Sequence, residues 1–205
     1  MRVENLYSFD ARLSRTAGKI IVGLDEAGRG PLAGPVVAAA VVLTCQIPGV
    51  DDSKKLDARS RKDLFFEILR NSITGIGLAT SMEIDRYNIL RATNIAMLRA
   101  LSQLSKVVRL SEALLIVDGT NIELPGFCIN LVKADMKSAS VAAASIVAKF
   151  LRDKIMEFYD SIYPGYGFLF NKGYPTPEHL RALKQLGPSR IHRKTFASKQ
   201  LKGRR

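Results

Sequence analysis

Residues 21–43 constrain the fold most, because two apolar runs flank a short polar island that carries two adjacent carboxylates. The first run, residues 21–24, leads into Asp25 and Glu26, and the second, rich in Val and Ala, spans residues 35–43. Each run has the uniform apolarity of a strand that is buried on both faces. Glycines and prolines between the runs indicate a short connection. The stretch therefore predicts two central strands, with two carboxylates where the first one ends.

The two carboxylates need a partner, because burying an unpaired carboxylate is costly and burying two is worse. A bound cation would remove this cost. Alternatively, Asp25 or Glu26 caps a turn or pairs with Arg29. Taken alone, these residues leave both interpretations open.

Two later strands are also followed by carboxylates. Residues 113–117 form an apolar run that ends on Asp118, and residues 127–132 form another, shortly before Asp135. Ligands collect at strand ends in open α/β sheets, although Asp118 could instead be a turn residue before a glycine. Hard oxygen ligands of this kind suit Mg²⁺ or Mn²⁺, and two such ions can activate a water and stabilise the leaving oxygen of a phosphodiester.

Strand geometry sets a condition on this site. Successive side chains of a strand point to opposite faces, so Asp25 and Glu26 can both bind an ion only under one of two conditions. The strand bends near Ala27 and Gly28, or Glu26 also uses its backbone carbonyl.

The order of apolar segments predicts an α/β fold with a mixed five-stranded sheet flanked by helices. The chain length suits one domain, residues 1–205, and residues 1–18 have the weak pattern of a loosely held arm. We expect strands at about 19–25, 35–43, 73–79, 113–117 and 127–132, and helices at 59–71, 83–104, 138–162 and 177–186.

Charge is concentrated at the C-terminal end. Residues 171–205 carry ten Lys or Arg and one Glu, which accounts for nine of the twelve net positive charges. Such a basic segment favours nucleic acid as the partner, the alternative being a solubilising tail. No apolar stretch reaches the roughly 20 residues of a membrane span, and the N-terminal residues lack the apolar core of a secretory signal, so we expect a cytoplasmic protein. We also expect it to be a monomer. Cys45 and Cys128 follow or interrupt apolar runs and are expected to be buried thiols.

The stretch DEAGRGPLAGP at 25–35 resembles the signature of type 2 ribonuclease H, the ribonuclease HII family. The resemblance implies a ribonuclease H-like fold with two divalent ions, Mn²⁺ or Mg²⁺. It also implies an endoribonuclease that hydrolyses the RNA strand of RNA–DNA hybrids and cuts 5′ of single ribonucleotides in duplex DNA. Asp25, Glu26, Asp118 and Asp135 become its catalytic metal ligands. Further matching pieces follow in order: DSKKL at 52–56, IDRYNILRATNIAM at 84–97, VDG at 117–119, KADMKSASVAAASIVAKFLRD at 133–153 and YPGYGFLFNKGYPTPEH at 163–179.

The same resemblance implies substrate contacts in the glycine-rich loop. Gly28, Arg29 and Gly30 resemble the family loop that senses the ribose 2′-hydroxyl, and glycines let a backbone approach a sugar closely. Lys54 and Lys55 could meet the phosphate backbone or belong to a solvated loop.

A tyrosine is expected to read the deoxyribose that follows the ribonucleotide. Tyr174 matches the family residue that stacks there, and Tyr166 is its rival eight residues away. The alternative for either tyrosine is packing inside an aromatic loop.

Two other functions compete with this interpretation. A non-catalytic, basic nucleic-acid-binding module explains the charge but not the carboxylates at three strand ends. A type 3-like ribonuclease H without junction specificity looks similar around the acidic residues. It usually lacks the Gly-Arg-Gly loop and has an extra N-terminal domain, which residues 1–18 are too short to form.

Overall fold

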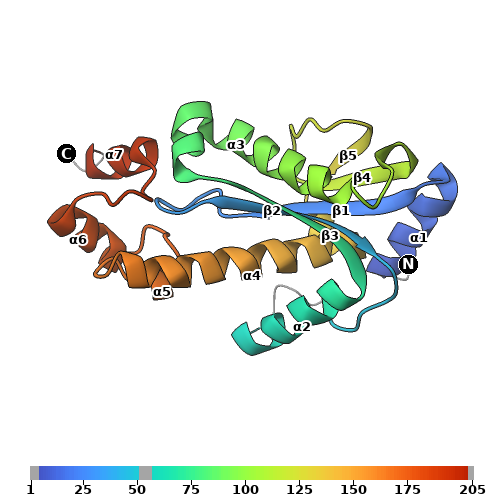
Figure 1. The fold of residues 1–205 in the computed structure, drawn as a ribbon, viewed down its shortest axis with the longest axis horizontal. Helices are drawn as coiled ribbons and strands as arrows, with labels where there is room; N and C mark the ends of the chain where they lie inside the picture. The colour runs from blue at the N-terminus through green and yellow to red at the C-terminus, as the bar shows by residue number, and fades with distance from the viewer. Residues whose placement is uncertain (1–4, 51–56, 203–205) are drawn as a thin grey trace.

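The computed structural model describes residues 5–50 and 57–202, with the side chains of residues 58 and 199–202 left aside. Its sheet has the strand order β3-β2-β1-β4-β5 (Figure 1). β1 pairs antiparallel with β2 and parallel with β4, while β2–β3 is antiparallel and β4–β5 is parallel. The predicted mixed five-stranded sheet is therefore confirmed. The strands are β1 Ile20–Ala27, β2 Val36–Leu43, β3 Ser72–Ala79, β4 Ala113–Asp118 and β5 Phe127–Leu131.

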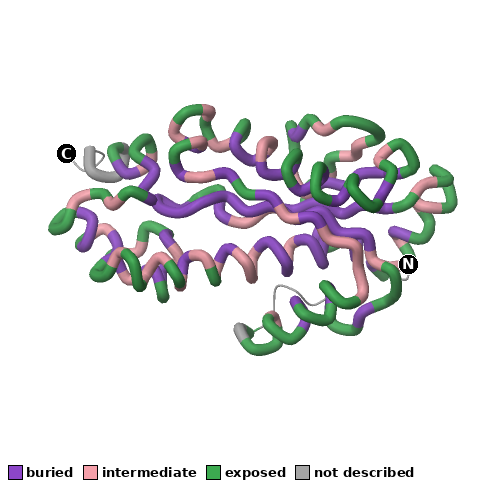
Figure 2. Tube along the Cα trace, in the orientation of Figure 1, coloured by how far each residue is buried: buried purple, intermediate pink, exposed green. Residues whose placement is uncertain are grey.

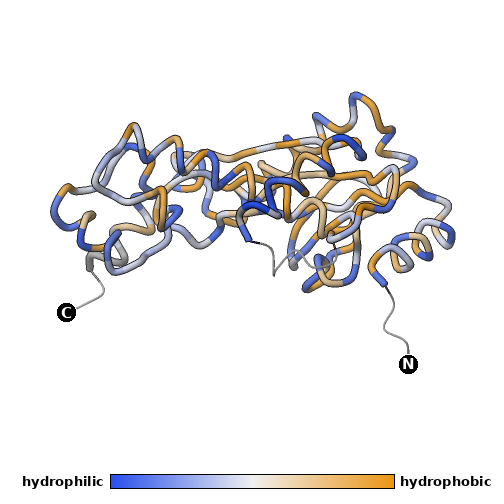
Figure 3. Tube along the Cα trace, turned by 90° about the horizontal axis from the view of Figure 1, so that it is seen from below, coloured by the Kyte–Doolittle hydropathy of each residue, from blue (hydrophilic) through white to orange (hydrophobic). Residues whose placement is uncertain are grey.

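Two long helices cover the two faces of the sheet: α3 (Ser81–Leu104) lies on one face and α4 (Ala139–Ile162) on the other (Figure 1). The interior turns of both helices and the central strands are buried (Figure 2), and apolar residues gather along the same segments (Figure 3). The small residues of α4 let it approach β1 closely, because a Cβ at Gly23 would lie 2.1 Å from a backbone atom of Ser140. α2 (Ala58–Arg70) packs against α4 and β3.

The expectation of a loose N-terminal arm was wrong, because residues Leu6–Ala17 form helix α1. The Asn5 side chain caps its N-terminus, and Gly18 ends it in the left-handed conformation. The Asp10 carboxylate accepts hydrogen bonds from the backbone N–H and the hydroxyl of Ser140 in α4, both at 2.8 Å. The anchor is polar, so the apolar periodicity of the segment did not reveal it.

Helix α3 is broken where the sequence predicted a continuous helix. Asn88 has a φ of 67°, outside the helical region. Its side-chain oxygen accepts the backbone N–H groups of Leu90 and Arg91 at 2.9 and 3.1 Å, so it caps the second part of the helix. The asparagine supplies its own cap, which explains how a positive φ is accommodated there.

The C-terminal end is helical, as predicted, and returns to the β1–β2 loop (Figure 1). Ala33 forms an isolated antiparallel bridge with His192, and the N–H of Arg193 donates to the carbonyl of Leu32. The sequence anticipated the middle one of the three helices in this region. They are α5 Phe168–Asn171, α6 Pro177–Leu186 and α7 Lys194–Lys202.

Two smaller findings complete the fold. Cys45 is exposed and Cys128 is half-buried, so the expectation of two buried thiols was wrong; Cys45 lies just beyond the end of β2. Of the helices that the structure describes, none is long and apolar enough to cross a membrane.

Candidate active site

Parallel pairing brings the first two carboxylates together. Leu24 of β1 is level with Val117 of β4, where the pairing of these two strands ends. The next residues, Asp25 and Asp118, therefore lie side by side and share a face, and β1 itself continues to Ala27. Asp25 is buried, and its pKa is raised well above its usual value. Burial is the main cause, followed by the negative charges of Glu26 and Asp118. The strand ends therefore form a crowded acidic site.

Glu26 lies on the opposite side of the strand. Pairing with β2 continues without a break from Asp25 to Ala27, so the strand does not bend between the two carboxylates. Glu26 Oε1 accepts a hydrogen bond from Arg29 at 3.2 Å, so the ion pair considered from the sequence is present. Its Oε2 atom, however, is buried without a hydrogen-bond partner among the described residues. Burial raises the pKa of Glu26, while Arg29 opposes that shift.

A backbone hydrogen bond from the neighbouring residue Ala134 places Asp135 near Asp118. It belongs to the short turn Ala134–Met136 before α4 and is buried. The N–H of Ala134 donates to Asp118 Oδ1 at 2.8 Å, which ties the turn to the end of β4. Within the described ranges, no three acidic, His or Cys side chains already surround one point. The use of all four carboxylates as one ligand set therefore stays a prediction.

The acidic residues nevertheless fit a divalent cation. All of their donor atoms are oxygens, which Mg²⁺ and Mn²⁺ prefer. A cation beside Asp25 and Asp118 would offset the repulsion that raises the pKa of Asp25. Because the strand does not bend after Asp25, Glu26 would join the same ion through its backbone carbonyl.

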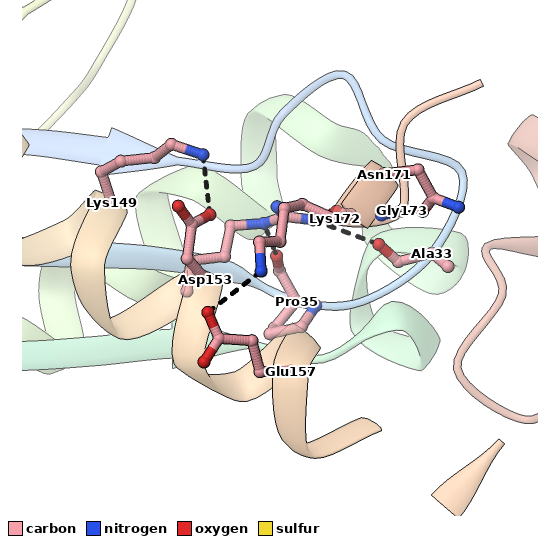
Figure 4. A network of polar contacts seen from close by, with 9 residues as sticks. Ala33, Pro35, Lys149, Asp153, Glu157, Asn171, Lys172 and Gly173 are labelled. Carbon is pink, nitrogen blue, oxygen red and sulfur yellow. Dashed lines mark hydrogen bonds and ion pairs between the residues drawn. The ribbon is translucent and has the colours of Figure 1, made fainter. Parts of the chain in front are cut away.

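Two arginines that the sequence did not single out lie behind the glycine-rich loop. Arg152 and Arg193 are both buried, and their guanidinium groups bind backbone carbonyls. Arg152 donates to Pro35 at 3.1 Å and to Ala33 at 3.2 Å (Figure 4). The sequence contains many basic residues and nothing in it marks Arg152 and Arg193 as buried, so neither arginine could be identified from the sequence.

Neighbouring carboxylates of α4 are paired at the surface of this network. Asp153 accepts from Lys149 at 2.7 Å, and Glu157 accepts from Lys172 at 3.1 Å (Figure 4). Asp153, which the sequence places on a helix surface, is thus engaged outside the acidic group at the strand ends.

The two candidate tyrosines have different environments. Tyr174 is 41% exposed, and a Cβ built at Gly30 would lie 3.7 Å from its ring. Tyr166 is 7% exposed, donates its hydroxyl to the carbonyl of Gly187 at 2.6 Å, and stacks on Phe168. Tyr174 therefore has an accessible ring beside the Gly-Arg-Gly loop, and Tyr166 packs in a core. Lys54 and Lys55 lie outside the described residues.

A model of the ribonuclease HII family matches residues 22–199, which include both strand ends and the loop between β1 and β2. The chain belongs to the ribonuclease HII family. A ribonuclease HII of Pseudothermotoga lettingae is 51% identical over 96% of this chain and 85% of its own length. One of Moorella thermoacetica is 50% identical over 95% of each chain. As a member of the ribonuclease HII family, the protein is an endoribonuclease.

Solved structures agree with the ribonuclease HII fold. The ribonuclease HII of Archaeoglobus fulgidus, solved in a complex with PCNA, has a TM-score of 0.70 at 26% identity and covers 85% of this chain and 93% of that chain. The ribonuclease H2 of Pyrococcus horikoshii has a TM-score of 0.68 at 27% identity, covering 88% and 96%. Bst-RNase HIII in complex with Mn²⁺ has a TM-score of 0.67 at 21% identity, over 89% and 69%, which shows a shared fold.

Proposed function

We propose that this member of the ribonuclease HII family hydrolyses the RNA strand of RNA–DNA hybrids and also cuts 5′ of single ribonucleotides embedded in duplex DNA. One observation carries the proposal. Asp25, which lies side by side with Asp118, is followed, with two residues between, by a glycine-rich loop that faces an exposed aromatic ring, Tyr174. Hydrolytic groups and sugar-reading groups thus lie at one end of the sheet.

The metal ligands in this proposal are Asp25, Glu26, Asp118 and Asp135, holding two Mn²⁺ or Mg²⁺ ions. When bound, such ions supply an activated water and stabilise the charge on the leaving oxygen. The protein contributes a buried acidic site at fixed strand ends. The backbone N–H of Ala134 orients Asp118, and Arg29 holds one oxygen of Glu26. Attack of water on the phosphorus with departure of the 3′ oxygen breaks the bond between them and leaves a 3′-hydroxyl and a 5′-phosphate.

Sugar recognition would come from two sides. The backbone of residues 28–30 reads the 2′-hydroxyl of the ribonucleotide, since glycines allow close approach. Tyr174 stacks on the next sugar, and stacking favours the form without an additional hydroxyl. The exposed ring of Tyr174 and the buried ring of Tyr166 support assigning this role to Tyr174.

The remaining parts of the proposal concern binding and cellular context. The basic segment at 171–205, with Lys54 and Lys55, would contact phosphates along the hybrid or duplex. We further propose that residues 1–205 act as a single catalytic domain, as a monomer, in the cytoplasm.

A comparison of three substrates tests the proposal. We expect metal-dependent cutting of an RNA–DNA hybrid and of a duplex with one ribonucleotide, and no cutting of the matching all-DNA duplex. Cutting of the hybrid alone would favour a type 3-like activity and refute the junction specificity. Binding of all three without cutting, at any divalent metal concentration, would support a non-catalytic binder.

A further inference from the structure

Arg152 and Arg193 are the two largest side chains that are fully buried, at 1% and 0% exposure. Among the described residues, neither forms an ion pair with a carboxylate, and their hydrogen bonds all go to backbone carbonyls. Burying a cation without an anion is expensive. We therefore ask which backbone conformation the hydrogen bonds of these two arginines hold in place.

Arg193 holds both ends of the β1–β2 loop with one guanidinium. Its Nη1 donates to the carbonyl of Arg29 at 2.9 Å, and its Nη2 donates to that of Gly28 at 2.6 Å. Nε and Nη2 also donate to the carbonyl of Gly34, at 3.0 and 2.9 Å. Burial, with the charge of Arg152, lowers the pKa of Arg193 to about 9, so it is still protonated at neutral pH. Nη2 also donates to the carbonyl of Pro35 at 3.4 Å. The planar group with five donors thus reaches four carbonyls at once, whereas a lysine ammonium has three donors.

These bonds fix the direction of the peptide N–H groups as well. In a trans peptide, the carbonyl of one residue points opposite to the N–H of the next, and no described peptide bond is cis. The carbonyls of Gly28 and Arg29 face the buried guanidinium, so the N–H groups of Arg29 and Gly30 face away from it. Arg29 and Gly30 are exposed, and neither N–H donates to an acceptor among the described residues.

Arg152 packs against the same loop at Gly28. Gly28 has a φ of +101°, and a Cβ there would lie 2.0 Å from Arg152 Nε. Gly28 is therefore required both by its conformation and by the arginine that fills the space of a side chain. The loop is held against the buried guanidinium groups of Arg152 and Arg193. If its carbonyls turned outward, these two cations would lose their hydrogen-bond acceptors.

We propose that Arg193 is a positioning residue that presents the N–H groups of Arg29 and Gly30 to the 2′-hydroxyl oxygen of the ribonucleotide. This inference rests on the proposed function and adds a residue to its sugar recognition. Two adjacent outward N–H groups form a small concave donor site suited to one oxygen. Arg193 itself does not touch the substrate.

The test compares Arg193→Lys with Leu104→Ala, a core variant at the C-terminal end of α3 that provides a matched loss of stability. Affinity is measured by fluorescence anisotropy in EDTA, for a duplex with one ribonucleotide and for the all-DNA duplex of the same sequence. Arg193→Lys should reduce the preference for the ribonucleotide about tenfold, as expected when a hydrogen-bonding site loses its alignment. Its affinity for the all-DNA duplex should change less than threefold by the same reasoning. Leu104→Ala should keep the wild-type preference.

The outcomes separate the inference from the proposed function. If the wild type neither cuts nor prefers the ribonucleotide duplex, the proposed function fails. If the wild type does both and Arg193→Lys keeps the preference, the role of Arg193 is refuted. Equal weakening on both duplexes also refutes it, because it would mean that the N–H groups bind a phosphate.

A measurement on the wild type covers the case in which Arg193→Lys does not fold. The amide signals of Arg29 and Gly30 are followed in ¹⁵N–¹H NMR spectra during titration with each duplex. We expect both signals to shift with the ribonucleotide duplex beyond their shift with the all-DNA duplex. Identical shifts with the two duplexes would overturn the inference.

Discussion

The Nε2 atoms of His179 and His192 lie 3.0 Å apart in the buried contact between α6 and the segment before α7. His179 Nδ1 lies 2.8 Å from the carbonyl of Tyr174, which can only accept a hydrogen bond. His179 Nε2 therefore accepts from His192, whose Nδ1 accepts from the N–H of Ser189 at 2.9 Å. This chain of hydrogen bonds is complete when both rings are neutral, and it ends at the backbone of the proposed sugar-reading tyrosine.

The histidine pair predicts a loss of stability in mild acid. Burial lowers the pKa of His179, and burial with the proximity of His179 lowers that of His192 from 6.5 to about 4. The unfolded chain then binds more protons than the folded one between these values. The stabilisation is complete above pH 6.5 and is lost as the pH falls from 6.5 to about 4.

Urea unfolding at several pH values from 7.5 to 4.5 measures this effect, with His192→Gln as the control that removes one titrating ring. The wild type should lose free energy of unfolding faster than the variant, by an amount on the order of 1–3 kcal/mol across the range. Parallel curves for the two proteins would contradict the assignment.

Asp118→Asn and Asp135→Asn should each lower cleavage by about 100-fold or more, at least the cost of disturbing groups around a metal site. The amide oxygen that Asp118→Asn introduces can still accept from the N–H of Ala134, so the fold should be retained. Losing a negative charge beside Asp25 should also bring the pKa of Asp25 down and should not lower the metal-free melting temperature. Cleavage rates and thermal melts are compared with Asp160→Asn, on α4. Near-normal rates in either site variant would refute the ligand set.

The two tyrosines should separate recognition from stability. Tyr174→Ala should sharply lower cutting of the single-ribonucleotide duplex with little change in stability, because its ring is exposed. Tyr174→Phe should retain more activity if stacking dominates. Tyr166→Ala should cost less in junction cutting and about 3 kcal/mol in unfolding free energy, as for other buried aromatic rings. Unchanged junction cutting by Tyr174→Ala would remove its proposed role.

Neutralising the chain end should weaken phosphate binding. Because α7 extends to Lys202, we favour substitution by Gln over deletion. Replacing Lys199, Lys202, Arg204 and Arg205 should flatten the salt dependence of binding by up to about 0.9 per lost phosphate contact. The rate at saturating substrate should change little. An unaltered salt slope would return the segment to a solubilising role.

The centre of the sheet could be predicted from the sequence because β1, β2 and β4 are buried on both faces along most of their length. The runs around Val22 and Val36 have no polar interruption, so their positions were right to within two residues. The adjacency of Asp25 and Asp118 follows once β1 and β4 are parallel. Those elements carry the acidic part of the candidate site.

Polar anchors could not be predicted in the same way. Helix α1 is held by Asp10, and helix α7 begins where Asp85 accepts the N–H groups of Lys194 and Thr195 at 2.8 and 2.9 Å. Arg193 binds carbonyls more than 150 positions away along the chain. Such contacts depend on loops that only the tertiary fold brings together, so the periodicity of apolar residues in the sequence does not predict them.

The most direct test of the account maps the ends produced from a duplex with a single ribonucleotide, labelled at either end of the ribonucleotide-containing strand. Water-mediated hydrolysis at the acidic strand ends predicts incision on the 5′ side of the ribonucleotide, with a 3′-hydroxyl on one fragment and a 5′-phosphate on the other. A cyclic phosphate, which attack by the 2′-hydroxyl would leave, or incision on the 3′ side would contradict the account.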